Sequence, residues 1–211
     1  MRRNGHLIII SGPSGVGKGT VCAELMRCRP DLTLSISATT RKKRPTENDG
    51  ESYYFYSVEE FNQLIDEGAL LEYAQVHGNY YGTPRRFVEE KIKAGCDVIL
   101  EIDVQGAMQV KRSMEDGVFI FLLPPEIRDL EERIRHRATE NEEEIRTRLK
   151  NAGKDLAMMH DYDYAVINDQ VETCAQTISK IIDAENQRID ADLIKNYWRE
   201  FNDQSIIQGT V

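Results

Sequence analysis

Apolar residues along the chain gather in short runs, and segments with apolar positions at helical spacing lie between them. The clearest strand-like runs are residues 7–10, 97–103 and 118–123, and a shorter alternating stretch lies at 32–37. Runs of this length between turn residues are typical of strands in a buried parallel sheet. Strands that alternate with helices predict an α/β protein with a mostly parallel sheet and right-handed crossovers. One long final helix is expected over about 171–201.

The segment 37–83 departs from this alternation. Its predicted strands, at residues 53–56 and 70–76, lie close together and are mixed with turns. A capping-box spacing from Ser57 predicts a short helix between them. Thr83 stands before a proline and is expected to cap the helix that follows. We therefore expect a small mixed α+β domain to be inserted at this point.

A glycine-rich segment follows the first apolar run and precedes a helical segment. This order of strand, loop and helix is the context of a phosphate-binding loop. In such a loop, backbone N–H groups and the positive end of the helix face an anion, and Lys18 would reach the outer phosphates of a nucleoside triphosphate. The simpler alternative is a glycine-rich turn between a core strand and a helix. The ATP-binding residues expected here are Gly12, Pro13, Ser14, Gly15, Val16, Gly17, Lys18, Gly19 and Thr20.

Gly19 departs from the usual loop pattern. That pattern has Ser or Thr at this position, and its hydroxyl binds magnesium. Here the hydroxyl comes one residue later, at Thr20, and the Gly-Lys-Gly-Thr ending resembles the loop of adenylate kinases. We therefore expect Mg²⁺, the cofactor that accompanies ATP, to be held through water, phosphates and acids elsewhere in the chain. Thr20 and Asp103 are the candidate residues for this indirect contact.

Charge and cysteine content narrow the possible partners. The net charge of −9 argues against nucleic-acid binding, which needs a broad basic face. The basic residues at 41–44 are then more consistent with a local phosphate site. Four cysteines without a Cys-x-x-Cys pair, and no signal peptide, predict reduced thiols and a cytoplasmic protein. No apolar run approaches the length of a membrane span, so we expect no membrane partner.

Several further blocks of sequence form a recognisable set. They are Ser-Ala-Thr-Thr-Arg at 37–41, Gly-Glu-Ser-Tyr at 50–53, Leu-Glu-Tyr at 71–73, Gly-Asn-Tyr-Tyr-Gly-Thr at 78–83, Glu-Ile-Asp-Val-Gln-Gly at 101–106 and Ile-Asn-Asp at 167–169. Together they resemble the guanylate kinase family over roughly residues 6–185. The resemblance implies transfer of the γ-phosphoryl group of ATP to GMP or dGMP, which gives GDP or dGDP and ADP in purine nucleotide metabolism.

The resemblance also implies a division of the chain. The expected fold is a three-layer, parallel-sheet phosphate-loop kinase core with an inserted mixed α+β GMP-binding region and a helical lid. The core would comprise residues 1–36, 84–125 and 156–211. The GMP-binding insertion would be 37–83, and the lid would be 126–155.

The same resemblance assigns the acceptor site. Arginines and tyrosines would hold the GMP phosphate, and Glu72, Ser37 and Thr83 would select the base. Guanine presents N1–H and N2–H₂ as adjacent donors that one carboxylate can accept, and a bidentate contact of this kind discriminates by about 1–3 kcal/mol. Without the resemblance, Glu72 could equally be a solvent-facing strand residue. The expected GMP-binding residues are Ser37, Arg41, Arg44, Tyr53, Glu72, Tyr81, Thr83, Glu101 and Asp103.

Catalysis would depend on cations around the transferred phosphoryl group. The resemblance implies lid arginines at Arg133, Arg137 and Arg148, although each could alone be a solvated helix residue. The lid reads His-Arg-Ala at 136–138, where the family usually has Gly-Arg-Gly. Asn168 is expected to lie at the adenine. The expected catalytic residues are Lys18, Arg41, Arg133, Arg137 and Arg148.

Two other functions are compatible with parts of the sequence. Guanylate-kinase-like domains also occur as non-catalytic interaction modules, but those typically lose the phosphate-loop chemistry that Lys18 retains here. A phosphate-loop kinase with another acceptor, such as AMP, is suggested by Gly19 and opposed by Glu72 and the Arg–Tyr set. The sequence is consistent with a monomer or a homodimer.

Overall fold

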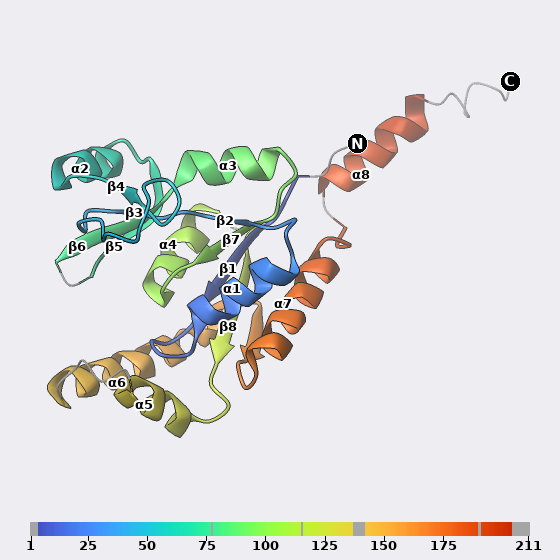
Figure 1. Ribbon diagram of the computed structural model, residues 1–211. Helices are drawn as coiled ribbons and strands as arrows, with labels where there is room; N and C mark the ends of the chain where they lie inside the picture. The colour runs from blue at the N-terminus through green and yellow to red at the C-terminus, as the bar shows by residue number, and fades with distance from the viewer. Residues whose placement is uncertain (1–3, 77, 115, 137–141, 190, 204–211) are drawn as a thin grey trace, which may run out of the picture.

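The computed structural model describes residues 4–76, 78–114, 116–136, 142–189 and 191–203. Its centre is a five-stranded parallel sheet with the order β2-β7-β1-β8-β9, which confirms the predicted α/β class (Figure 1). The strands are β1 (Leu7–Ser11), β2 (Thr33–Leu34), β7 (Val98–Glu101), β8 (Val118–Leu123) and β9 (Tyr164–Ile167).

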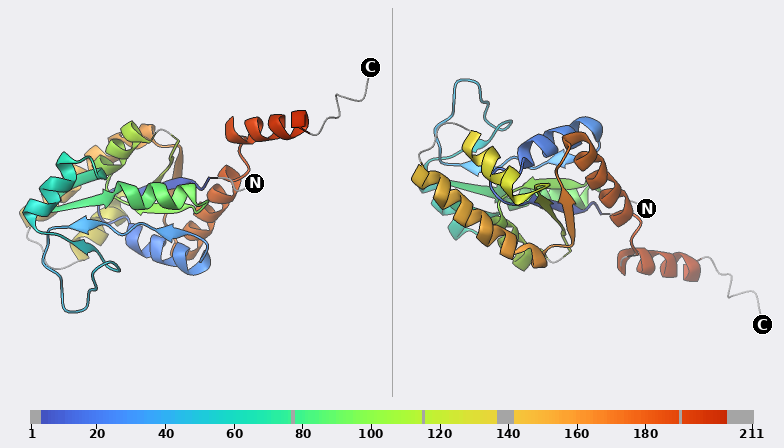
Figure 2. Two further views of the ribbon diagram at one scale, coloured as in Figure 1. Left: turned by 90° about the horizontal axis from the view of Figure 1, so that it is seen from above. Right: turned by 90° about the horizontal axis from the view of Figure 1, so that it is seen from below.

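Helices cover both faces of this sheet, so the core has three layers (Figure 2). Ile8 and Ile10 pack into the cluster beneath one set of helices, whereas Leu7 and Ile9 pack into the cluster on the opposite face. Successive strand side chains point to opposite faces, so a strand covered on both sides is apolar throughout. The first face is covered by α1 (Lys18–Cys28), α5 (Ile127–His136), α6 (Glu142–Ala157) and α7 (Val171–Glu185), and the second by α3 (Arg85–Lys93) and α4 (Val104–Ser113).

A second, smaller sheet has the order β4-β3-β6-β5 and mixes parallel and antiparallel pairs. Its strands are β3 (Ala38–Thr39), β4 (Tyr54–Phe55), β5 (Leu70–Val76) and β6 (Asn79–Pro84), and α2 (Val58–Asp66) accompanies them. The capping box predicted at Ser57 is present, and Phe61 of α2 is fully buried against this sheet. The boundaries of the inserted domain, residues 37–83, stay a prediction.

The helix cap predicted at Thr83 was wrong, because Thr83 lies within β6. The next helix begins at Arg85, and Pro84 occupies its N-cap position without a side-chain capping bond. The Thr83 hydroxyl instead donates a hydrogen bond to buried Glu72.

The predicted helix over 171–201 is divided into α7 and α8 (Ala191–Asp203). Asn186 ends α7, and its side-chain Nδ2 donates a hydrogen bond of 3.0 Å to Asp97 at the start of β7. This long-range contact holds the end of the helix against the sheet, which local periodicity could not reveal. The predicted strand at 32–37 is likewise shorter, with only Thr33–Leu34 paired.

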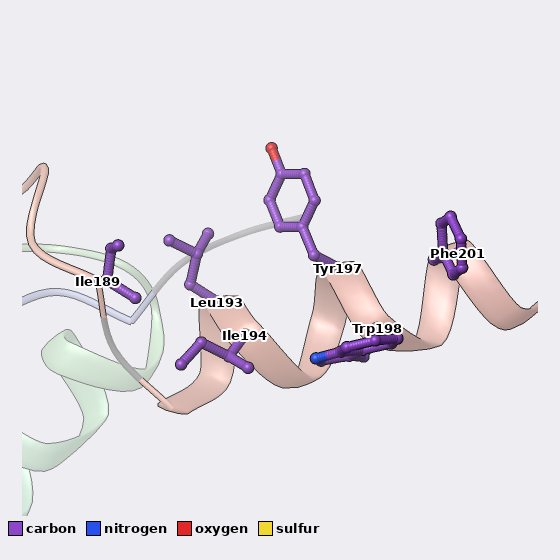
Figure 3. Close-up of a pocket in the computed structure, with 6 residues that line it drawn as sticks. All are labelled: Ile189, Leu193, Ile194, Tyr197, Trp198 and Phe201. Carbon is purple, nitrogen blue, oxygen red and sulfur yellow. The ribbon is translucent and has the colours of Figure 1, made fainter.

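Helix α8 extends away from the three-layer core (Figure 1). Helix α8 and Ile189, which comes shortly before it, carry exposed apolar side chains that line an open groove (Figure 3). They are Ile189, Leu193, Ile194, Tyr197, Trp198 and Phe201. The helices in the described residues are all too short or too polar to cross a membrane.

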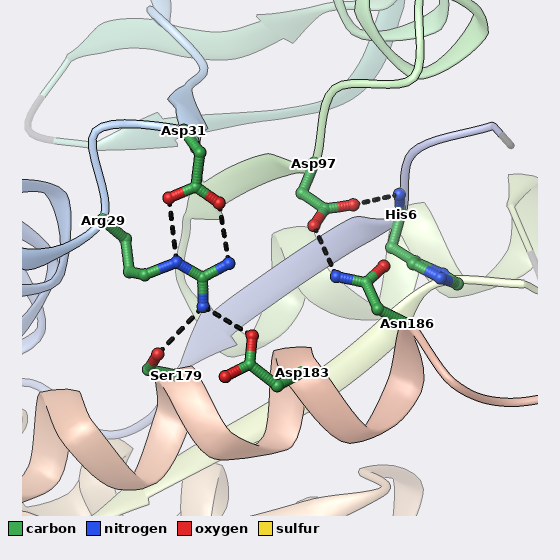
Figure 4. A network of polar contacts seen from close by, with 7 residues as sticks. All are labelled: His6, Arg29, Asp31, Asp97, Ser179, Asp183 and Asn186. Atoms are coloured by element: carbon green, nitrogen blue, oxygen red, sulfur yellow. Dashed lines mark hydrogen bonds and ion pairs between the residues drawn. The ribbon is translucent and has the colours of Figure 1, made fainter. Parts of the chain in front are cut away.

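A polar network joins α1 to α7 at the edge of the core (Figure 4). The Arg29 guanidinium binds both carboxylate oxygens of Asp31, at 2.8 and 2.7 Å, and also reaches Ser179 and Asp183 of α7 at 2.9 Å. A bidentate arginine of this kind orders the chain between α1 and β2. The network therefore fixes the helix that begins at the glycine-rich loop.

We predict that Arg29→Met lowers the free energy of unfolding by about 1 kcal/mol. The loss is modest because the partner carboxylates are exposed, so that water screens much of their attraction to Arg29. Arg27→Met is the matched control. Arg27 also forms a bidentate pair, with Glu24, but it is 71% exposed and bonds within its own helix. We expect a smaller change there, because the pair is exposed to solvent. Urea denaturation of both variants tests this, and equal losses would contradict it.

Candidate nucleotide-binding site

The glycine-rich loop packs so closely on the sheet that side chains are excluded at two positions. A Cβ added at Gly12 would lie 2.6 Å from the Leu122 carbonyl oxygen, and one at Gly17 would lie 2.6 Å from Asn168 Nδ2. Gly17 also has φ of 98°, in the left-handed region. The residues predicted to bind ATP, Gly12, Pro13, Ser14, Gly15, Val16, Gly17, Lys18, Gly19 and Thr20, form one continuous loop and the first turn of α1.

Asn168 supports this loop through its side chain. Its Nδ2 donates to the Val16 carbonyl oxygen at 2.8 Å, and the residue is only 4% exposed. The sequence placed Asn168 near the adenine and indicated no role for its amide group. The structure brings it to the loop, where it fixes the backbone that would face the phosphates.

Lys18 is the first residue of α1, and its ammonium group lies inside the loop. Nζ donates to the Gly12 carbonyl oxygen at 2.7 Å. Burial lowers the pKa of Lys18, whereas the carboxylates of Glu101, Asp155 and Asp103 favour its charged form. A partly desolvated ammonium ion with acids around it is well suited to a polyanionic ligand that arrives with a divalent cation.

Asp155 was missed from the sequence. It lies in α6, seven residues after Arg148, and this spacing places both on one face of a helix. Since Arg148 was already a candidate, the spacing could have indicated Asp155. Burial raises the pKa of Asp155, and the nearby Lys18 opposes that shift.

Two of the predicted lid arginines meet at the loop. Arg133 of α5 donates to the carbonyl oxygens of Val16 and Asn168, both at 3.3 Å. Arg148 of α6 donates to Ser14 Oγ at 2.7 Å. Arg137 lies outside the described residues. The helices that carry these arginines therefore already contact the phosphate loop in this structure.

The two acids at the end of β7 point to different neighbours. Asp103 caps α4, because its Oδ1 accepts a hydrogen bond of 2.7 Å from the Gly106 N–H. Glu101 lies beside the loop, 3.3 Å from the position that a Cβ on Gly19 would occupy. Loss of water around its carboxylate raises the pKa of Glu101, and Lys18 lowers it. Thr20, the other metal candidate, is exposed.

A second cluster, built from the smaller sheet, gathers predicted GMP-binding side chains. The Arg41 guanidinium lies 5.3 Å from the centre of the Tyr53 ring, and the Tyr53 and Tyr81 rings meet edge-on at 6.1 Å. Arg41 also forms a bidentate pair with Glu47, at 2.7 and 3.0 Å. That hydrogen bond from Arg41 lowers the pKa of Glu47 to about 2. Arg44 is exposed, and its backbone N–H donates to Glu47.

Glu47 was missed because its partnership with Arg41 is made by a loop rather than by a periodic element. The sequence did place both residues in one polar segment, but nothing in their spacing indicates a contact. In this structure the carboxylate of Glu47 occupies the guanidinium face that could otherwise bind a phosphate.

Glu72 is a buried carboxylate, which excludes the solvent-facing alternative. The residue is 7% exposed, and Thr83 Oγ1 donates to its Oε1 at 2.7 Å. Its Oε2 lies near α4, since a Cβ added at Gly106 would be 2.7 Å away. Burial raises the pKa of Glu72 to about 7, although the bond from Thr83 opposes this. Ser37 lies partly buried just before β3.

Two acids, Glu101 at the end of β7 and Asp103 just after it, lie between the phosphate loop and the second cluster. The negative charge of Asp103 acts to raise the pKa of both Lys18 and Glu72, and that of Glu101 acts to raise the pKa of both Lys18 and Tyr53. A loop for a triphosphate thus faces a second site with an arginine, two tyrosines and a buried carboxylate. The parallel sheet and the glycine-rich loop at the start of α1 are those of a phosphate-loop kinase.

Comparison with known proteins identifies the family. A family model described as guanylate kinase matches residues 4–185. The chain is 48% identical over 206 residues to guanylate kinase from Lactococcus lactis, covering 98% of this chain and all of the relative. It is 53% identical over 186 residues to guanylate kinase from Clostridium tetani, covering 88% and 89%. The crystal structure of guanylate kinase from Anaplasma phagocytophilum is 34% identical, with a TM-score of 0.71 and 89% of each chain covered.

The chain belongs to the guanylate kinase family. Its activity is the ATP-dependent phosphorylation of GMP to GDP. This result confirms the family, the fold and the enzymatic function predicted from the sequence. Neither the interaction module nor a kinase with a different acceptor agrees with these matches.

We predict that GMP binding weakens as the pH falls through 7, because only ionised Glu72 can accept both guanine donors. With a pKa of about 7 in the free protein, the ionised fraction falls about tenfold between pH 8 and pH 6. Isothermal titration calorimetry with GMP at several pH values measures this loss.

Glu72→Gln is the control, since GMP carries a phosphate that also titrates. The variant should keep the pH dependence due to that phosphate and lose the part due to Glu72. Parallel pH profiles for the two proteins would contradict the role of Glu72.

Proposed function

We propose that the two clusters bind the two substrates of the reaction, with Mg²⁺-ATP at the glycine-rich loop and GMP or dGMP on the smaller sheet. The observation that carries this proposal is the buried Glu72 carboxylate, held by Thr83 on one oxygen and close to α4 on the other. A buried carboxylate is unfavourable unless a ligand or a neighbour satisfies it. Adjacent guanine donors would satisfy it, and adenine offers no such pair.

The triphosphate would lie against the loop backbone and the side chains that converge there. Lys18 would bind the outer phosphates in place of its present carbonyl partners. Arg133 and Arg148 reach the loop from two helices, so they would neutralise charge on the transferred phosphoryl group. Arg137 is proposed for the same task. Asn168 would bind indirectly, by holding Val16 in the loop.

The residues present suit magnesium in its usual mode with ATP. Within the described parts of the chain, no three His, Cys, Asp or Glu side chains form a metal cage. Mg²⁺ commonly keeps several waters and is bound through one or two carboxylates together with substrate phosphates. Asp103 and Thr20 would act through such waters. The ion would supply charge neutralisation on the β- and γ-phosphate oxygens.

The phosphate of GMP would be held by Arg41, Arg44, Tyr53 and Tyr81. Arg41 has to exchange Glu47 for the phosphate, and both are bidentate acceptors of the same guanidinium fork. The tyrosine hydroxyls can donate to the remaining phosphate oxygens. The pair of Arg41 and Glu47 therefore keeps the guanidinium ordered before GMP arrives.

Chemistry at this site needs alignment more than proton transfer. The accepting oxygen of GMP is already ionised, so no general base is required. Catalysis would come from holding the two phosphate groups in line and neutralising their repulsion. Each group named above belongs to one chain, so a monomer and a homodimer are equally compatible with the mechanism. A cytoplasmic location is supported by the four free cysteines.

We predict that Lys18→Ala lowers kcat at least about 100-fold, because it removes a cation that stabilises charge in the transition state. The affinity for GMP should change by less than about twofold, since Lys18 lies outside the acceptor cluster. Steady-state kinetics and GMP titration calorimetry measure the two effects.

Lys180→Ala is the matched control, because Lys180 is exposed on α7 next to Ser179, which meets Arg29 beyond the end of α1 opposite to the loop. It should retain wild-type values for both quantities. Lost GMP binding with retained turnover in Lys18→Ala would contradict the proposed layout.

A further inference from the structure

The edge strand of the smaller sheet, β5, contains an extra residue beside Glu72. The antiparallel register of β5 and β6 shifts between Leu70 and Tyr73. Two residues of β5, Leu71 and Glu72, therefore stand against the single residue Thr83 of β6. Two residues against one form a β-bulge, and bulges are frequent next to active sites, where they redirect a side chain.

The bulge turns the Glu72 side chain toward α4. In a regular strand, neighbouring side chains point to opposite faces, so Glu72 would point away from the face that Leu71 occupies. Leu71 packs into the apolar cluster that contains Ala107 of α4. The Glu72 carboxylate nevertheless reaches the same helix, since a Cβ added at Gly106 would lie 2.7 Å from its Oε2. Both residues of the bulge thus face α4.

Gln109 of α4 binds the strand at the residue that follows the bulge. Its Oε1 accepts a hydrogen bond of 3.1 Å from the Tyr73 N–H, and its Nε2 donates one of 2.9 Å to the Tyr73 carbonyl oxygen. A side-chain amide offers the same acceptor and donor as a peptide group. Because β5 is an edge strand, Gln109 takes the place of a neighbouring strand at this residue.

We propose that Gln109 is a positioning residue for base recognition, because it fixes the bulge of β5 so that the Glu72 carboxylate points at the base of GMP. This inference rests on the proposed binding of GMP at the smaller sheet. It adds to that site a residue of the core that does not touch the nucleotide.

The strand is held on both sides of Glu72. On the preceding side, Arg85 donates to the carbonyl oxygens of Gly68 and Leu70, at 3.2 and 3.4 Å. On the following side, Gln109 supplies two hydrogen bonds. A strand fixed at both ends of a bulge has little freedom to change the direction of the side chain between them.

The helix that carries Gln109 is itself fixed to the core. Asp103 caps its first turn through a hydrogen bond of 2.7 Å from the Gly106 N–H, and Ala107 and Val110 are fully buried. Recognition by hydrogen bonds needs polar groups within about 0.5 Å of their productive positions. The single bond from Thr83 to Glu72 restrains one carboxylate oxygen, and Gln109 restrains the backbone that carries the side chain.

The test compares two acceptors that differ in one hydrogen-bond donor. Inosine monophosphate (IMP) has the N1–H of GMP and lacks the N2 amino group. The ratio of the Kd of IMP to the Kd of GMP therefore reports how well Glu72 meets both donors. Isothermal titration calorimetry measures both values at pH 8, above the pKa of about 7 of Glu72.

Gln109→Leu removes both hydrogen bonds to Tyr73 and should lower this ratio at least about fivefold, the lower end of what a bidentate base contact contributes. The kcat at saturating GMP should stay within about threefold, because the phosphate groups are aligned by other residues. A merely structural role would lower stability without changing the ratio. Gln63→Leu is the matched control, because Gln63 is exposed on α2 and donates its amide to Glu67 at the end of the same helix.

A double-mutant cycle shows whether Gln109 acts through Glu72. In the Glu72→Gln background, Gln109→Leu should change the ratio by less than about twofold, because the carboxylate that it positions is absent. Gln109→Asn keeps the amide but shortens the side chain by one C–C bond, roughly 1.5 Å, so it should also lower the ratio. Binding of a fluorescent ATP analogue reports the folding of each variant, and Gln109→Asn decides the result if Gln109→Leu does not fold.

Two results would overturn the inference while the proposed GMP site stands. One is a wild-type ratio in the folded Gln109 variants when Glu72→Gln lowers it. The other is an equal loss from Gln109→Leu with and without the Glu72 carboxylate. If the wild type bound GMP and IMP equally well, or if Glu72→Gln kept the wild-type ratio, the proposed role of Glu72 would fail first, and the inference about Gln109 with it.

Discussion

The rest of the structure depends on the close approach of the glycine-rich loop to the ends of the central strands. The loop backbone meets a carbonyl of β8 at Gly12 and the Asn168 amide at Gly17, at distances that no side chain permits. This packing directs Lys18 into the loop and leaves carbonyl oxygens for Arg133 to bind. Phosphate binding is therefore prepared by backbone contacts made in the folded protein, before any nucleotide is present.

In the proposed mechanism, selectivity for the acceptor would depend on a different device, a buried carboxyl group at Glu72. Glu72 has one strong partner, Thr83, and its pKa is raised to about 7 by burial. Near neutral pH the Glu72 carboxyl group is therefore partly neutral and partly ionised. Guanine would shift that balance, because its paired donors stabilise the charged form. Base recognition and pH dependence would then be two consequences of one buried residue.

The sequence predicted correctly those elements that depend on interactions between residues close together in the chain. The all-apolar β1, the capping box at Ser57 and the loop around Lys18 follow from short-range patterns. Several of the misses involve partners distant in the sequence. Thr83 binds Glu72 across two strands, Asn186 ends α7 by reaching Asp97, and Asp155 approaches Lys18 only in the folded chain. The predicted roles of Arg41, Tyr53 and Tyr81 came from family resemblance, since no spacing rule brings them together.

The most direct test of the central claim is the choice of acceptor. ADP release from Mg²⁺-ATP should be measured with GMP, dGMP, AMP, CMP and UMP offered separately to the purified protein. We expect rapid release with GMP and dGMP alone, since only guanine presents two adjacent donors to Glu72. Comparable release with AMP would contradict base selection by this carboxylate, and no release with any acceptor would contradict the arrangement of donor and acceptor sites derived from the fold.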